Sequence, residues 1–290
     1  MKEFLSRIGF GCVGLTSLDS ERSALSILEA SYSNGIRHFD TADIYGKGYS
    51  EEILGKFIGK RREHINVATK FGLGNGKKNI LPIKFAIKLN KIQKKIRRSN
   101  LMISNESEIS NLKEVSISRD YVSLCLANSL SRLKTDYLDY YLLHEKMPYH
   151  LENETTDFLS NLKEKGIIRK LGVDSSIKKY HHPNNNEYRI FDTIQHEANL
   201  LDINIFNLLK NKEQIIHSLY NLYNSFDLQR IPYEERFGFL IGSVLLKNPE
   251  SKVIFSSSKI KNIENNIKYG HKYFSDIDLT NSYLKNHIKK

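Results

Sequence analysis

The chain has 290 residues, a mass of 33.6 kDa and a formal net charge of +11. This length suits one α/β barrel or two domains of about 150 residues each. No apolar run approaches the roughly 20 residues of a membrane-spanning helix, and the charged opening MKEFLSRIGFGCVG is not typical of a secretory signal peptide. The sequence therefore predicts a soluble, cytoplasmic protein without membrane association.

The two cysteines, Cys12 and Cys125, have neither metal-ligand nor redox spacing, so we expect no metal site and a reducing compartment. The basic residues are densest over 83–98, IKFAIKLNKIQKKIRR, where they are spread around a predicted helix with one aromatic residue, Phe85. This arrangement argues against a nucleic-acid partner. A solvated basic helix is the better interpretation, and attraction for an anionic cofactor or substrate is a second one.

Short apolar segments alternate with helical patterns along the whole chain. The strand candidates are residues 6–11, 37–41, 65–70, 137–143, 168–173, 191–195, 214–218 and 252–255. Helical spacing of apolar residues follows at 20–34, 119–133, 155–165, 234–247 and 260–269.

Repeated strand–helix units of this kind predict parallel strands and a single (β/α)8 TIM barrel over residues 1–290, with its core at about 5–270. The connection at 72–118 is long for one loop, so we expect an insertion after the third strand. The pattern is least regular over residues 200–230, where the strand candidate at 214–218 is the one predicted element.

The segment GFGCVG, residues 9–14, matches the G-x-G-x-x-G pattern of dinucleotide-binding folds, with Asp40 further on at a strand end. In that fold the helix begins within the glycines and meets the pyrophosphate. Here LTSLDS separates the glycines from the next helical pattern, and no tyrosine is followed by a lysine four residues later. The doubly wound fold is therefore the weaker interpretation.

Polar side chains end three consecutive strand candidates. Asp40 ends the second, Lys70 the third and His144 the fourth, with Tyr45 on the loop after Asp40. A barrel brings these strand ends to its C-terminal face, where active sites form. Each residue alone is typical of an ordinary strand end, but all four together indicate a site.

This set of groups suits the reduction of a carbonyl compound. A tyrosine hydroxyl can supply a proton to the carbonyl oxygen, although its ordinary pKa near 10 makes it a weak acid. An ammonium beside it favours the phenolate, and a carboxylate keeps that ammonium charged and oriented. We assign these roles to Tyr45, Lys70 and Asp40, while His144 would hydrogen-bond the carbonyl oxygen.

Longer segments carry a family resemblance. GIRHFDTADIYGKGYSEEILG, VATKFG, SLSRLKTDYLDYYLLH, LKEKGIIRKLGV and IQHEANLLD occur in this order, and with them nearly the whole chain resembles the aldo-keto reductase superfamily. The resemblance implies a (β/α)8 barrel with a catalytic tetrad of Asp40, Tyr45, Lys70 and His144. It also implies NAD(P)H-dependent reduction of an aldehyde, ketone or sugar carbonyl.

The resemblance further implies where a cofactor would bind. Asp174 and Ser175 stand where the family has a Ser-Asn pair for the nicotinamide carboxamide, and Gln195 is retained. His217 takes the place of an aromatic residue that stacks on the nicotinamide ring. The full set of expected contacts is Gly11, Cys12, Asp40, Asp174, Ser175, Gln195, His217, Ser218, Tyr220, Ser256, Ser257, Ser258, Lys259 and Asn266.

The segment VIFSSSKIKNIENN resembles the family's last cofactor-binding block. Ser256 and Asn262 replace basic residues that usually bind the 2′-phosphate of NADP, while Lys259 and Lys261 lie nearby. The resemblance favours NADP(H) over NAD(H). The alternative function is that of a cofactor-binding regulatory or scaffold subunit, and a monomer or small homo-oligomer is expected in either case.

Overall fold

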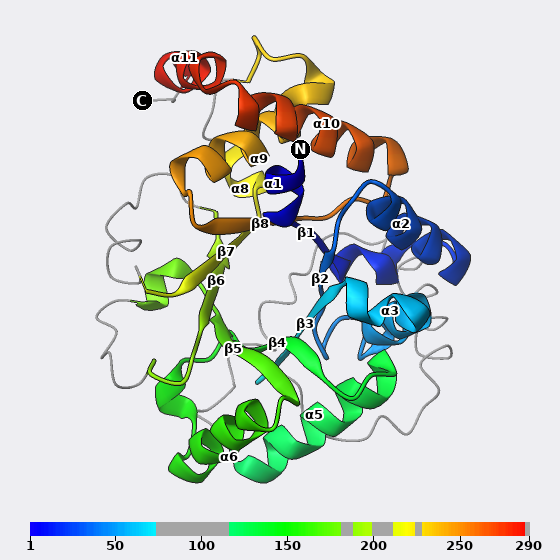
Figure 1. Ribbon diagram of the computed structural model, residues 1–290, viewed down its shortest axis with the longest axis vertical. Coiled ribbons are helices and arrows are strands. Elements are labelled where there is room, and N and C mark those ends of the chain that lie inside the picture. Colours follow the sequence, from blue (N-terminus) through cyan, green and yellow to red (C-terminus); the bar gives the residue numbers. More distant parts are fainter. Residues whose placement is uncertain (74–115, 181–187, 199–210, 224–227, 288–290) are drawn as a thin grey trace, which may run out of the picture.

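The computed structural model describes residues 1–73, 116–180, 188–198, 211–223 and 228–287. Within these residues, eight parallel strands close into a barrel in chain order, and β1 pairs with both β2 and β8 (Figure 1). The strands are β1 (Ile8–Gly11), β2 (His38–Asp40), β3 (Asn66–Phe71), β4 (Leu138–His144), β5 (Ile168–Asp174), β6 (Thr193–Glu197), β7 (Glu213–His217) and β8 (Ser251–Phe255). The predicted TIM barrel is confirmed.

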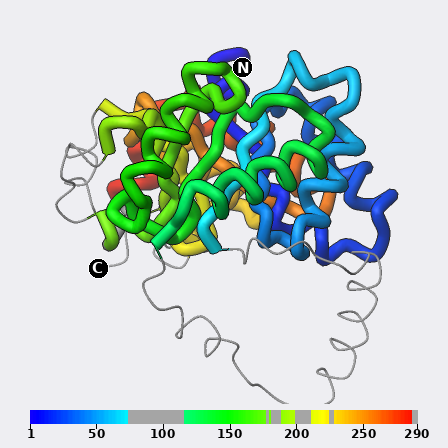
Figure 2. Tube along the Cα trace, turned by 90° about the horizontal axis from the view of Figure 1, so that it is seen from below, coloured from blue at the N-terminus to red at the C-terminus, as the bar shows by residue number. Residues whose placement is uncertain are grey.

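Helices surround the strands on the outside. They are α1 (Lys2–Ser6), α2 (Glu21–Ser33), α3 (Tyr49–Ile58), α5 (Arg119–Leu133), α6 (Asn153–Glu164), α8 (Tyr220–Tyr223), α9 (Arg236–Lys247), α10 (Ile260–Ser275) and α11 (Ile277–His287). Figure 2 shows α5 and α6, in green, in front of the barrel and the N-terminus at one of its ends. None of the described helices combines the length and apolar character that crossing a bilayer requires.

The connection between β3 and α5 occupies residues 72–118, as expected, and the basic helix predicted at 83–98 lies outside the described residues. Other boundaries also differ from the prediction, most of them by one or two residues, and α10 continues to Ser275 where the predicted helix ends at 269. Ser6, expected to begin the first strand, is the last residue of α1. The sixth strand begins at Thr193, two residues later than predicted.

Local sequence signals set the ends of the long helices. Ser20 caps α2 by accepting a hydrogen bond from the backbone N–H of Ser23, and Ser118 caps α5 in the same way through Tyr121. Each cap satisfies one of the N–H groups that a helix start leaves unpaired. The caps therefore stabilise the first turns of the helices that follow β1 and β3.

Strand alternation divides the barrel interior into three layers, because every second side chain points inward. At the base, Glu213 accepts hydrogen bonds from Lys170 at 2.7 Å and from Tyr140 at 3.1 Å, and it pairs with Lys252. Above this ion cluster lies a small apolar layer of Ala68, Leu142, Ile215 and Ile254. The polar strand ends form the third layer, so the closed, packed interior supports them from below.

A second, larger core lies between the strands and the helices. It includes the outward-facing strand residues Phe39, Val67, Leu143 and Val173, all with no exposed surface. Inside the barrel, Gly172 leaves room for Leu142, because an added Cβ would lie 2.4 Å from the Leu142 side chain. Burial on both faces of the sheet explains why the strand candidates read as nearly continuous apolar runs.

Candidate functional site

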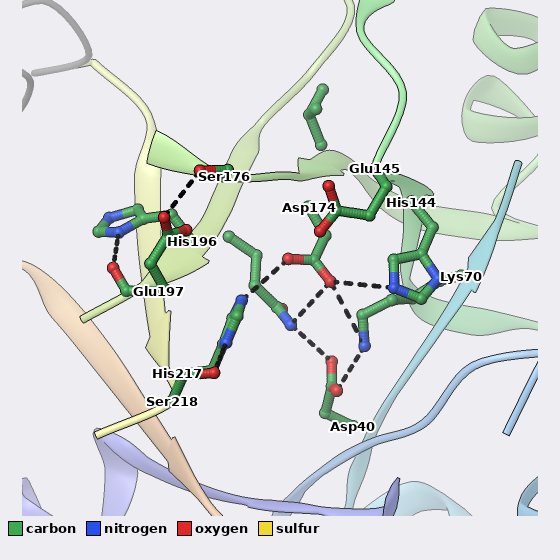
Figure 3. A network of polar contacts seen from close by, with 12 residues as sticks. Asp40, Lys70, His144, Glu145, Asp174, Ser176, His196, Glu197, His217 and Ser218 are labelled. Carbon is green, nitrogen blue, oxygen red and sulfur yellow. Dashed lines mark hydrogen bonds and ion pairs between the residues drawn. The ribbon is translucent and has the colours of Figure 1, made fainter. Parts of the chain in front are cut away.

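The polar strand ends meet in a row across neighbouring strands. His144 on β4 is the register partner of Asp174 on β5, and Asp174 is the register partner of Gln195 on β6. Backbone pairing therefore places these three side chains at one height inside the rim. Figure 3 shows Asp174 between His217 on one side and Lys70 and His144 on the other.

Asp40 and Lys70 form the centre of the site. The Lys70 ammonium has no exposed surface and donates to Asp40 Oδ1 at 2.5 Å and to the carbonyl of Thr41 at 3.0 Å. The other carboxylate oxygen of Asp40 accepts from Gln195 Nε2 at 3.2 Å. Such burial of a charge is tolerated only when it is paired and hydrogen-bonded, as it is here.

Tyr45 reaches the same point from the loop after β2. The backbone N–H of Tyr45 donates to the carbonyl of Ala42, and its own carbonyl accepts from the N–H of Ser50, which fixes the loop against the start of α3. Lys70 Nζ lies 5.4 Å from the centre of the Tyr45 ring. The rings of Tyr45 and His144 have centroids 6.2 Å apart and are nearly perpendicular. The structure thus brings together all four residues that the sequence singled out.

Charge and burial act in opposite directions on the two proton-bearing groups. Burial lowers the pKa of Lys70, but the nearby Asp40, Tyr45 and Asp174 raise it by more. The net pKa is above the ordinary value, so the amine stays protonated. The Lys70 charge lowers the pKa of Tyr45, whereas burial and the two carboxylates raise it, with a net rise above the ordinary value. At neutral pH the phenol of Tyr45 therefore keeps its proton.

His144 is a neutral imidazole. Burial, followed by the charge of Lys70, lowers its pKa to about 4. Its Nε2 lies 3.9 Å from the nearer oxygen of Asp174, beyond hydrogen-bonding distance, and its Nδ1 has no partner among the described residues. The ring can therefore donate a hydrogen bond to a bound ligand without competing strongly with protein groups.

A cavity of about 500 Å³ opens above these groups; we refer to it as the rim cavity. Asp40, Tyr45, Asp174 and Gln195 lie in its wall. The other lining residues are Gly11, Val13, His144, Glu145, His217, Ser218, Leu219, Tyr220, Phe237, Ile254, Phe255 and Ser256. Its volume falls within the range of small-molecule sites.

A second cavity of about 720 Å³, here the outer cavity, shares Tyr220, Phe237 and Ser256 with the first. The remaining lining residues are Tyr223, Tyr233, Glu234, Ser257, Ser258, Asn262, Asn265 and Asn266. The rings of Tyr220 and Tyr223 are nearly parallel, with centroids 5.7 Å apart. In the described chain, this wall offers hydroxyl, amide and aromatic groups but neither lysine nor arginine.

Most of the expected cofactor contacts line one cavity or the other, but three do not. The Cys12 side chain is fully buried with its thiol against the carbonyl of Phe10, and burial raises its pKa. Ser175 is 1% exposed and lines neither cavity. Lys259 is exposed at the start of α10 and lines neither cavity.

Several lining residues were absent from the expected set. Glu145 directly follows His144, and Leu219 directly follows Ser218, so the positions next to strand ends are the sequence signal that could have found them. Glu145 and Ser218 both adopt left-handed backbone conformations, each with φ of 55°. Residues of this kind concentrate at functional sites.

The described residues fit a dinucleotide. The Oε1 atom of Gln195 is buried in the wall of the rim cavity and has no hydrogen-bond partner among the described residues, so a ligand amide group could satisfy it. The two adjoining cavities, which share three lining residues, extend from the tetrad to the polar segment 256–258. A nicotinamide at one end and an adenosine at the other would match this sequence of groups.

Comparison with known proteins identifies the family. The model of the aldo/keto reductase family matches residues 7–234. This stretch covers more than half of the chain, which therefore belongs to the aldo/keto reductase family.

Individual relatives are more distant. The chain is 32% identical over 171 residues to the uncharacterized oxidoreductase YqkF of Bacillus subtilis, covering 59% of this chain and 45% of that protein. It is 28% identical over 180 residues to versiconal hemiacetal acetate reductase of Aspergillus parasiticus, covering 59% of this chain and 48% of that protein. The chain spans about half the length of these curated relatives.

Solved structures agree in fold. Aldo-keto reductase AKR11C1 from Bacillus halodurans, in its holo form, matches with a TM-score of 0.64 and 22% identity, covering 94% of this chain and 91% of that one. An aldo-keto reductase from Klebsiella pneumoniae in complex with NADPH matches with a TM-score of 0.61 and 18% identity, covering 91% and 84%.

Proposed function

We propose that the protein is an NAD(P)H-dependent oxidoreductase that reduces an aldehyde, ketone or sugar carbonyl to the alcohol. The observation that carries this proposal is the convergence of a phenol, an ammonium, a neutral imidazole and a carboxylate at one rim of the barrel. The family match over residues 7–234 supports the same activity.

In this mechanism Tyr45 is the general acid. Its phenol is protonated at neutral pH and gives its proton to the carbonyl oxygen as negative charge develops there. The Lys70 ammonium, 5.4 Å from the ring centre, stabilises the phenolate that remains. Asp40 holds that ammonium in place through the 2.5 Å ion pair.

His144 would orient the substrate. A neutral ring can donate one N–H to the carbonyl oxygen and so stabilise charge at that atom in the transition state. His144 and Tyr45 both line the rim cavity with ring centroids 6.2 Å apart, so both can reach one oxygen. This arrangement fixes the carbonyl between them.

A reduced nicotinamide dinucleotide would supply the hydride. Gln195 would bind its carboxamide, the face of the His217 ring would lie against the nicotinamide, and Ser218 and Tyr220 would flank the diphosphate. Ser256, Ser257, Ser258 and Asn266 would hold the adenosine end. We propose NADP(H) over NAD(H), because the hydroxyl and amide groups that line the outer cavity can hydrogen-bond a 2′-phosphate. The discrimination should be modest, because the lining residues include the carboxylate of Glu234 and neither arginine nor lysine.

The decisive experiment follows the loss of NADPH absorbance with a panel of neutral aldehydes, ketones and aldoses. Tyr45→Phe should abolish turnover and leave the dissociation constant of NADPH nearly unchanged, because the ring remains while the proton is lost. Loss of cofactor binding in this variant would contradict the role assigned to Tyr45.

A second candidate, a cofactor-binding regulatory subunit, is favoured by the acid at position 174 inside the site. The same assay separates the two functions. Steady NADPH consumption with any carbonyl of the panel supports the enzyme, whereas tight NADPH binding with no turnover across the whole panel supports the subunit.

A further inference from the structure

The site contains a second buried carboxylate that the tetrad does not use. Asp174 ends β5 and is 5% exposed. Its Oδ1 lies 3.2 Å from His217 Nε2, and its Oδ2 lies 3.5 Å from Gln195 Nε2 and 3.8 Å from Lys70 Nζ. A carboxylate this deeply enclosed is stable only when cations and hydrogen-bond donors face it.

His217 is held at both ring nitrogens. Besides the contact of Nε2 with Asp174, its Nδ1 lies 2.7 Å from Ser218 Oγ. A doubly protonated ring can donate from Nε2 to the carboxylate and from Nδ1 to the hydroxyl oxygen. The geometry therefore accommodates an imidazolium at the wall of the rim cavity.

Charge balance points the same way. Among the described residues, the polar layer at the rim end of the interior holds the carboxylates Asp40 and Asp174, and Lys70 is fully enclosed between them. With a neutral His217 one buried negative charge would remain without a counter-ion. With a protonated His217 the two acids face two cations.

We infer that Asp174 is a positioning residue that holds His217 as an imidazolium at the cavity wall and shares Lys70 with Asp40. The inference rests on the proposed function for its consequence, namely that Asp174 keeps Tyr45 in its acid form. Without this carboxylate the Lys70 charge would act on the phenol with less opposition.

The groups around His217 come from several strands. Asp174 lies on β5, Asp40 on β2, Lys70 on β3 and His144 on β4, and β6 contributes His196 and Glu197, the register partner of His217. Burial lowers the pKa of His217, but the hydrogen bond and charge of Asp174 raise it above the ordinary value, with Lys70 opposing and Asp40 adding to the rise. Removing the Asp174 charge should reverse this balance.

The test is an NMR titration of the histidine ring signals in the unliganded protein, with His217 assigned through His217→Gln. The midpoint of His217 should lie above the ordinary value of about 6.5 and fall in Asp174→Asn. Glu154→Gln, which removes one exposed carboxylate of a surface ion pair, is the matched control and should leave the midpoint unchanged. An unchanged midpoint in Asp174→Asn overturns the inference.

If Asp174→Asn does not fold, the titration of the unaltered protein is sufficient to test the inference. A His217 midpoint at or below the ordinary value in that protein also overturns it. Kinetics then test the consequence. In Asp174→Asn the alkaline limb of kcat/KM for carbonyl reduction should move to lower pH, since the pKa of Tyr45 loses one of the charges that raise it. The titration needs neither cofactor nor turnover. If the unaltered protein reduces no carbonyl, but its His217 midpoint lies above the ordinary value and falls in Asp174→Asn, the proposed function is refuted and the charge pair stands.

Discussion

Lys70 and Asp40 form an ion pair of 2.5 Å in which the ammonium has no exposed surface. The pair Arg61–Glu29, at 2.9 Å, has a similar length but lies on the surface, with half of the glutamate side chain exposed. The two pairs differ in burial much more than in distance, and burial decides what the loss of one partner costs.

The first prediction compares these pairs. Asp40→Asn should lower the free energy of unfolding by about 3 kcal/mol, because it leaves an enclosed ammonium with Asp174 as its nearest carboxylate. Glu29→Gln should cost less than about 1 kcal/mol. Urea denaturation monitored by circular dichroism measures both. Equal effects of the two substitutions would contradict the enclosure of the pair.

The second prediction concerns His144. Because its pKa lies at about 4, His144 should contribute no step to the pH profile of kcat between about pH 5 and 8. His144→Leu should lower kcat roughly 100-fold by removing a donor to the carbonyl oxygen. His64→Leu, at an exposed position, is the control. If the pH profile of kcat shows a limb near the ordinary histidine pKa and this limb is absent in His144→Leu, the His144 ring titrates in that range and the prediction is contradicted.

The third prediction concerns cofactor choice. Asn262→Arg places a guanidinium in the wall of the outer cavity, where it can bind a phosphate through two parallel hydrogen bonds. The dissociation constant of NADPH should fall at least about tenfold relative to that of NADH, which corresponds to about 1.4 kcal/mol. Cofactor titrations by fluorescence measure it, with Asn161→Arg on α6 as a charge-matched control. Equal tightening for both cofactors would place the 2′ position elsewhere.

The fourth prediction concerns the base of the barrel. Burial raises the pKa of Glu213, but Lys252 and Lys170 lower it more, to about 2. A depressed pKa means that this carboxylate contributes stability in full above its ordinary pKa of 4.5 and loses the contribution as the pH falls toward 2.

Glu213→Gln should therefore cost about 1–3 kcal/mol at neutral pH and flatten the dependence of unfolding free energy on pH in this acid range. Denaturation at a series of pH values gives the slope, and Glu164→Gln at an exposed site should leave it intact. A slope that is the same in Glu213→Gln and in the unaltered protein would assign the acid sensitivity to other carboxylates.

The barrel could be predicted from sequence because its strands are buried on both faces and are separated by regular helical patterns. The short helices α1 and α8 and the terminal helix α11 were missed for the opposite reason. Five residues in α1 are too few for a periodic signal, and α11 has exposed residues over much of its surface. Tertiary packing, such as the burial of Phe4, stabilises α1 more than helix propensity does.

The tetrad was predictable because each member stands at or just after a strand end, where position along the strand determines position in space. The partners of Asp174 were not. His217 is distant from Asp174 in sequence. The two side chains meet because the closed barrel is curved, which brings the inner faces of β5 and β7 together although β6 lies between them. The sequence also did not indicate that Phe237 and Tyr233 line the outer cavity. Phe237 lies within a predicted helix, residues 234–247, and Tyr233 lies just before it.

The row of His144, Asp174 and Gln195 is fixed by backbone pairing between adjacent strands and not by the loops above it. The segments that follow β3 and β6 can therefore change in length or composition while the reactive groups keep their spacing. The strands hold the reactive groups, and the connecting loops contact the substrate. Changes in these loops can therefore alter which substrates bind without altering the positions of the reactive groups on the strands.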